Sequence, residues 1–150
     1  RDLDPNFMQT HLQLANSLLE LGAHEAALDS ARRAAELAPN SALPLYVLCF
    51  ALMKNGFRAE ARNVLAKWEM TAENEYVSPY FLGLANLAVG NTDKAFEHLF
   101  AAQQEKSAWA LWFGTEPKLD VIRTDQRYFD LMRLTGNPIL ALLDNKGGGA

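Results

Sequence analysis

Apolar residues recur along the first two thirds of the chain at the three- and four-residue spacing of amphipathic helices. In the first such stretch, Leu14, Leu18 and Leu21 fall on one side of the expected helix. The spacing and its breaks predict helices over 8–21, 24–37, 42–55, 58–71, 78–89 and 92–105. The expected fold class is therefore all-α, with the helices arranged in consecutive pairs.

Small residues repeat at a fixed interval. Two series recur every 34 residues, namely Gly22, Gly56 and Gly90, followed five residues later by Ala27, Ala61 and Ala95. A constant period of this length indicates a repeat protein. Each glycine is expected to allow the tight turn between two helices. Each alanine is expected where the two helices approach closely, because a larger side chain would push them apart.

Proline and capping residues mark where several helices begin. Pro44 falls in an expected first turn, where its missing N–H costs nothing. Ser78 is typical of an N-cap, with Pro79 as the first helical residue. Asp125 is expected to cap a further helix over 126–134.

These repeat residues resemble the tetratricopeptide repeat family over roughly residues 1–107. The matching positions are Leu14-Ala15, Gly22, Ala27, Ala34 and Pro39 in the first repeat, Leu48-Cys49, Gly56, Ala61 and Leu65 in the second, and Leu82-Gly83, Gly90, Ala95, Leu99 and Ala102 in the third. The sequence departs from the family pattern at Trp68, Glu73, Asn86 and Ser107. The resemblance implies an α–α superhelix of three helix pairs, stacked with a right-handed twist.

The expected organisation is three repeats between two atypical ends. Its segments are 1–7, the tail of a preceding repeat; 8–41, 42–75 and 76–109, the three repeats; and 110–150, a helical cap with a tail. The end of a stack needs a cap to cover its stacking face. The segment 108–136 is similar to one that closes such arrays in many bacterial regulatory proteins. Its apolar residues are Trp109, Leu111, Trp112, Phe113, Leu119, Val121, Ile122, Tyr128, Phe129, Leu131 and Met132.

Composition narrows the function classes. The 150 residues are 49% hydrophobic and carry a net charge of −4, which suits a folded domain and not a nucleic-acid surface. One cysteine excludes a disulfide framework and a cysteine zinc site within one chain. No window has the length and apolarity of a membrane span. We expect a cytoplasmic location.

The sequence predicts no catalytic or metal site and no cofactor. It lacks a glycine-rich phosphate loop, an HExxH motif and a nucleophile elbow. The three histidines, His11, His24 and His98, lie on different expected helices. Cys49 occupies a small-residue position and is expected to be buried. An enzyme is the least supported of the function classes considered.

The resemblance places the functional surface on the concave side, which the first helix of each pair lines. We expect a peptide-binding groove there, and its residues are Leu12, Asn16, Tyr46, Phe50, Met53, Tyr80, Leu84 and Leu87. The core is assigned to neighbouring positions, namely Leu14, Leu18, Leu48, Leu52 and Leu82. The groove should therefore be apolar and aromatic.

One well-known member type binds the C-terminal carboxylates of chaperones through a clamp of cationic and amide side chains. The matching positions here are Leu12, Asn16, Val47, Val77 and Phe81, of which only Asn16 fits. Without cations at these positions, the sequence predicts no charge-assisted binding of carboxylates.

The leading hypothesis is a non-catalytic protein-interaction module that binds an apolar peptide or helix and forms part of a larger protein. The groove could instead be filled by the chain's own tail, residues 139–144, or by a second copy of the chain, or the tail could pack on the cap. The alternative class is a sensory or regulatory domain of a bacterial transcription regulator or nucleotide cyclase.

Overall fold

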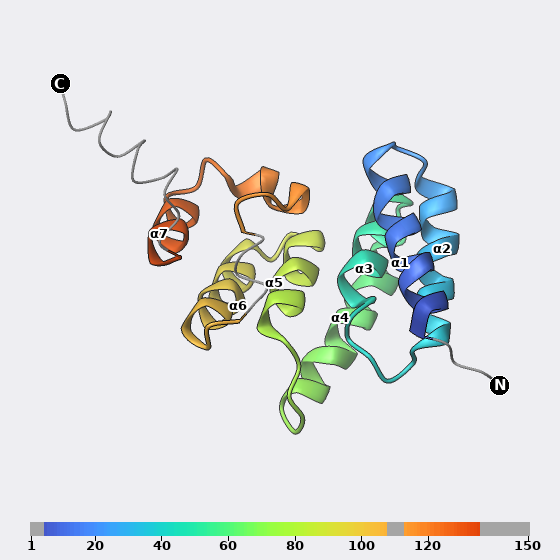
Figure 1. The fold of residues 1–150 in the computed structure, drawn as a ribbon, viewed down its shortest axis with the longest axis horizontal. Helices are drawn as coiled ribbons and strands as arrows, with labels where there is room; N and C mark the ends of the chain where they lie inside the picture. Colours follow the sequence, from blue (N-terminus) through green and yellow to red (C-terminus); the bar gives the residue numbers. More distant parts are fainter. Residues whose placement is uncertain (1–4, 108–112, 136–150) are drawn as a thin grey trace.

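The computed structural model describes residues 5–107 and 113–135, which are helical and contain no strands (Figure 1). Its α-helices are α1 (Pro5–Glu20), α2 (His24–Leu37), α3 (Leu45–Lys54), α4 (Arg58–Ala72), α5 (Pro79–Ala88), α6 (Thr92–Gln104) and α7 (Gln126–Leu134), with a 3-10 helix, η2 (Pro117–Ile122), before the last. Three helix pairs, α1–α2, α3–α4 and α5–α6, stack on one another as an α–α superhelix. The predicted fold class is confirmed.

The three repeat glycines form the turns inside the pairs. Gly22, Gly56 and Gly90 have φ values of 80°, 81° and 87°, a region that only glycine adopts without cost. After each helix the same backbone bond closes the turn, as from the Ala23 N–H to the Leu18 carbonyl at 2.9 Å. This is the hydrogen-bond pattern of a Schellman C-cap. The same geometry at all three turns explains why glycine recurs at these positions.

The repeat alanines lie where paired helices come closest. Ala27, Ala61 and Ala95 each have no exposed surface. A Cβ added at Gly83 of α5 would lie 3.0 Å from the Leu99 side chain of α6. The third pair is therefore as tightly packed as the spacing of small residues predicts.

Two helix starts differ from the sequence prediction. Helix α1 begins at Pro5, so residues 5–7 are helical and do not form a separate tail. Helix α3 begins at Leu45, which places Pro44 at the N-cap instead of in the first turn. Ser78 is the N-cap of α5 as expected, but its side chain makes no capping hydrogen bond.

The assignment of Leu14 to the core is also corrected. Leu14 is 46% exposed, and Leu21, which was expected on the same side of the helix, is 81% exposed. The equivalent of Leu14 two repeats later, Leu82, is only 3% exposed. In α3 and α5 this face packs against the preceding helix pair, whereas no described residue covers it on α1. Stacking, and not pairing, buries this face.

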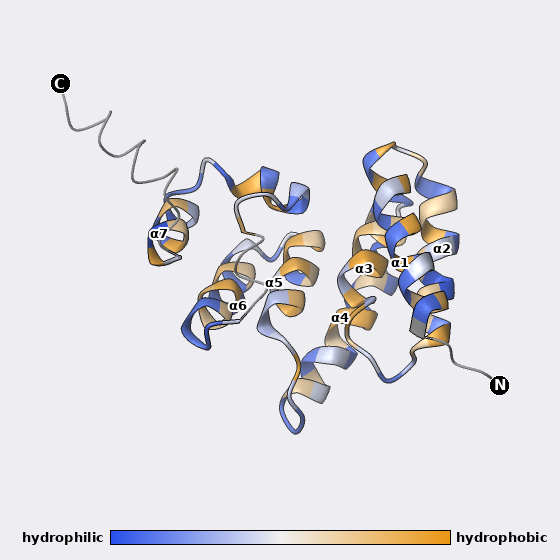
Figure 2. Ribbon diagram, in the orientation of Figure 1, coloured by the Kyte–Doolittle hydropathy of each residue, from blue (hydrophilic) through white to orange (hydrophobic). Residues whose placement is uncertain are grey.

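Helix α5 lies at the centre of the molecule. Its residues from Pro79 to Leu87 are all buried, and the ribbon is apolar along most of its length (Figure 2). One side joins a core shared with the first two pairs, and the other joins a second core shared with α6 and the cap. The cap residues of that second core are Phe113, Leu119, Ile122, Tyr128, Leu131 and Met132.

Not every apolar residue of the cap is buried. Val121 is 76% exposed and Phe129 is 36% exposed, which corrects their assignment to the covering surface. Both side chains lie outside the second core, because Leu119, Leu131 and their neighbours occupy the buried side of each short helix. The other expectations for the cap and tail, at Trp109, Leu111, Trp112 and residues 139–144, lie outside the described residues.

Substitution Ala61→Leu should destabilise the protein by about 1–3 kcal/mol, because the added atoms have no space between α3 and α4. The matched control is Ala59→Leu, two residues earlier on the exposed side of α4. Chemical denaturation of both variants provides the measurement. Equal stability of the two would contradict the close approach.

Asp125 should make stability depend on pH. Its carboxylate caps α7 by accepting the Arg127 N–H at 2.9 Å. Hydrogen bonds from the Arg127 side chain, and then this backbone bond, lower the pKa of Asp125. Because the folded pKa is the lower one, this stabilisation is present above the ordinary aspartate pKa and is lost as pH falls through the folded value.

Asp125→Asn should therefore lower the melting temperature at neutral pH, and the difference from the unmodified protein should disappear in strong acid. Glu97→Gln, an exposed change within α6, is the control. A melting difference that stays constant from pH 7 to pH 2 would show that the charge plays no part.

Candidate functional site

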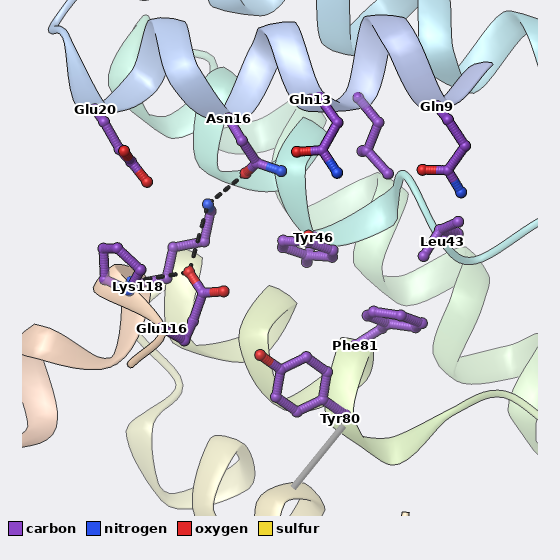
Figure 3. Close-up of a pocket in the computed structure, with 12 residues that line it drawn as sticks. Gln9, Gln13, Asn16, Glu20, Leu43, Tyr46, Tyr80, Phe81, Glu116 and Lys118 are labelled. Carbon is purple, nitrogen blue, oxygen red and sulfur yellow. Dashed lines mark hydrogen bonds and ion pairs between the residues drawn. The ribbon is translucent and has the colours of Figure 1, made fainter. Parts of the chain in front are cut away.

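A pocket of about 310 Å³ opens on the concave side, between α1, the start of α5 and the segment around η2 (Figure 3). Its walls come from all three repeats and the cap. The lining residues are Gln9, Leu12, Gln13, Asn16, Glu20, Leu43, Tyr46, Tyr80, Phe81, Glu116, Pro117 and Lys118.

Two walls of this pocket differ in chemistry. Helix α1 presents a row of amides, Gln9, Gln13 and Asn16, which share one face because they are four and three residues apart. Facing them is an aromatic floor, in which the rings of Tyr46 and Phe81 stack with centroids 5.4 Å apart and planes 2° apart. Tyr80 meets Phe81 edge to face at 5.6 Å. Hydrogen-bonding groups thus face an apolar surface.

Lys118 forms the third wall. Its Nζ donates to Asn16 Oδ1 at 2.5 Å and lies 3.7 Å from Glu116 Oε1 (Figure 3). The ammonium also lies 5.5 Å and 5.6 Å from the ring centroids of Tyr46 and Phe50, within cation–π range. Its side chain is only 10% exposed. The cap therefore contacts the first repeat across the concave face.

The segment that carries Lys118, residues 113–122, is called the strap below. Leu119 and Ile122 anchor it in the second core. The Glu116 side chain caps η2 by accepting the Lys118 N–H at 3.2 Å. Arg123 donates to the Glu116 carbonyl at 3.1 Å and to the Tyr128 hydroxyl. The backbone of the strap is thus held from both ends.

Burial sets the protonation states of the pocket. It raises the pKa of the Tyr46 and Tyr80 hydroxyls, so both stay neutral at physiological pH. It lowers the pKa of Lys118, an effect that Glu116 and Glu20 oppose by favouring the charged form. The lining holds two carboxylates, Glu20 and Glu116, and one ammonium, so its formal charge is −1.

The structure brings together only some of the residues predicted for the groove. Leu12, Asn16, Tyr46 and Tyr80 line the pocket. Phe50 lines a second hollow of about 200 Å³, together with Leu19, Glu20, Lys54, Pro117, Lys118 and Val121. Met53 packs, half-buried, against the first core.

Leu84 and Leu87 do not lie on an open surface, which corrects their assignment. They are 0% and 7% exposed and belong to the second core. The cap, with Phe113 and Leu119 among its buried residues, shares that core and covers the inner side of the third repeat. The accessible concave surface is therefore shorter than the repeat pattern alone predicts.

Glu116, Pro117 and Lys118 were missed as pocket residues. Glu116 is the N-cap of η2 and also lines the pocket. Lys118 brings a cation to the pocket from the cap, although the expected clamp positions carry none. No spacing in the sequence signals this contact, since Asn16 and Lys118 are 102 residues apart.

The side chains at the clamp positions do not form a carboxylate-binding site in the structure either. Two of its positions, Val47 and Val77, are apolar and buried. The Asn16 amide already accepts from Lys118, and Glu20 and Glu116 would repel an incoming carboxylate.

Comparison with known proteins agrees with the fold. The family model described as Tetratricopeptide repeat matches residues 4–115. The chain belongs to the tetratricopeptide repeat family. Tetratricopeptide repeats generally mediate protein–protein interactions, and the family is a non-enzymatic repeat module. No curated protein and no solved structure matches the chain significantly.

The other candidate chemical groups of this tetratricopeptide repeat protein are structural. Cys49 is buried, and burial raises the pKa of its thiol to about 12, which leaves it unreactive as a thiolate. Arg32 pairs with Glu60 through two hydrogen bonds of 2.6 and 3.1 Å. Within the described ranges, no cluster of acidic, histidine or cysteine side chains suits a metal ion, and no helix is long and apolar enough to cross a membrane.

Leu119→Ala should destabilise the protein by about 2–5 kcal/mol, because it leaves a cavity where the strap enters the second core. Val121→Ala, on the exposed side of the same helix η2, should change stability by no more than about 0.5 kcal/mol. Denaturant unfolding of the two variants makes the comparison. A small effect of Leu119→Ala would mean that the strap is not anchored there.

Proposed function

We propose that this tetratricopeptide repeat module binds an extended segment of a partner protein in the concave pocket, with an apolar side chain on the aromatic floor. The observation that carries the proposal is the stacked pair Tyr46 and Phe81 at the base of an open hollow. Aromatic side chains at the base of a concave, partly apolar site are the usual anchors of protein recognition.

The α1 wall suits the backbone of such a segment. Gln9 and Gln13 each carry a donor and an acceptor, as does each peptide unit of an extended chain. They stand opposite Leu43 and the ring of Tyr46, so a bound segment would lie between amides and an apolar surface. Burial keeps the Tyr46 and Tyr80 hydroxyls neutral, so the floor itself carries no charge.

The pocket favours binding over catalysis. Its one cation–carboxylate pair, Lys118 with Glu116, is engaged with Asn16 and with the cap of η2. Catalysis would need a nucleophile and a base within hydrogen-bond reach of each other, and the side chains that line the pocket offer amides, phenols and this occupied ion pair. We therefore infer a non-catalytic module.

A library of random dodecapeptides displayed on phage, selected against the protein, should yield sequences rich in apolar residues. Tyr46→Ala should weaken binding of the selected peptides by about tenfold or more, since aromatic anchors dominate such interfaces. Tyr76→Ala removes the same atoms from a side chain that is 76% exposed and lies outside the pocket, so binding should be unchanged.

Isothermal titration of the selected peptides against both variants supplies the affinities. Equal loss in the two variants, or selected peptides that are indifferent to Tyr46→Ala, would contradict the proposed site.

A further inference from the structure

The Lys118 side chain separates two hollows on the concave face. The larger, of about 310 Å³, lies toward the amide row of α1, and the smaller, of about 200 Å³, lies toward Phe50 and Val121. Glu20, Pro117 and Lys118 line both. The hollows therefore adjoin at these residues, and the Lys118 side chain occupies part of the space between them.

The ammonium of Lys118 lies in surroundings that suit any alkylammonium group. Two aromatic rings lie within 5.6 Å of it, and the Asn16 carbonyl oxygen accepts its hydrogen bond. Glu116 lies 3.7 Å away, and Glu20 adds a second negative charge. Aromatic rings combined with carboxylates and an amide oxygen form a typical site for a desolvated ammonium.

Only the side chain of Lys118 needs to leave this site. The backbone of the strap is fixed by the burial of Leu119 and Ile122 and by the cap at Glu116. A lysine side chain, by contrast, has four rotatable bonds and three rotatable donors. The exchange of one ammonium for another therefore requires no rearrangement of the cap.

We propose that Lys118 occupies in cis a subsite that takes a lysine side chain of the partner peptide, so that the module recognises segments that are both apolar and basic. This inference rests on the proposed function and adds to it a preference for positively charged peptides. When Lys118 turns aside, the subsite is left with Glu20 and Glu116, a formal charge of −2, which selects a cation and disfavours an acidic segment.

The subsite itself is tested with n-butylammonium, which reproduces the end of a lysine side chain. In the Lys118→Ala variant, millimolar n-butylammonium should raise the melting temperature and shift the Asn16 side-chain amide signal in NMR spectra. The same concentrations of n-butanol and butyrate should have little effect. Lys67→Ala, at an exposed lysine of α4, should respond to none of the three.

Peptide specificity is tested with three heptapeptides that contain two leucines and differ only in a central lysine, norleucine or glutamate. The lysine peptide should bind about tenfold more tightly than the norleucine peptide, an effect between those of an exposed and a fully desolvated cation–π contact. The glutamate peptide should bind most weakly. Lys118→Ala should strengthen binding of the lysine peptide by about tenfold, because the competing ammonium is gone.

Glu116→Gln keeps the acceptor that caps η2 and removes the charge. This substitution should weaken binding of the lysine peptide severalfold and leave binding of the norleucine peptide unchanged. It remains informative if the Lys118→Ala variant fails to fold. Equal binding of the lysine and norleucine peptides, with Tyr46 still required, would overturn the inference and leave the proposed function intact. If none of the three peptides bound the unmodified protein, while n-butylammonium still bound the Lys118→Ala variant, the proposed function would be overturned instead.

Discussion

The close approach of two helices within each pair is the constraint on which the rest of this structure depends. Alanine at positions 27, 61 and 95 lets the helix axes come together, and the left-handed glycine before each one allows the chain to reverse. The three turns have the same geometry, and residues of all three first helices line one pocket. Any binding surface there follows from this repetition.

The cap then breaks the repetition. It buries Leu119 and Ile122 against the third pair and so covers part of the inner side of α5. The same segment turns Lys118 toward α1, where it meets Asn16. One short element thus closes the core at the end of the stack and shapes the pocket at its centre. The covered and open parts of the concave face are set by this element and not by the repeats.

Charge in the pocket follows from partial burial. Lys118 is held among aromatic rings and carboxylates, where loss of water opposes its charge and Glu116 and Glu20 favour it. The phenols of Tyr46 and Tyr80 are kept neutral by the same burial. The pocket thus combines amides, neutral hydroxyls and aromatic faces with a slight excess of negative charge.

The sequence by itself determined the helices, the turns and the family, because these depend on neighbouring residues: a glycine at a left-handed position, an alanine five residues on, and Asp125 one residue before α7. Repeat register also predicted that Asn16, Tyr46 and Tyr80 share one side of the stack, and these residues line one pocket. Only the tertiary structure decided which inner residues stay open. Burial of Leu84, exposure of Leu14 and the position of Lys118 depend on segments brought together by stacking and by the strap, and contacts across such distances leave no periodic pattern in the chain.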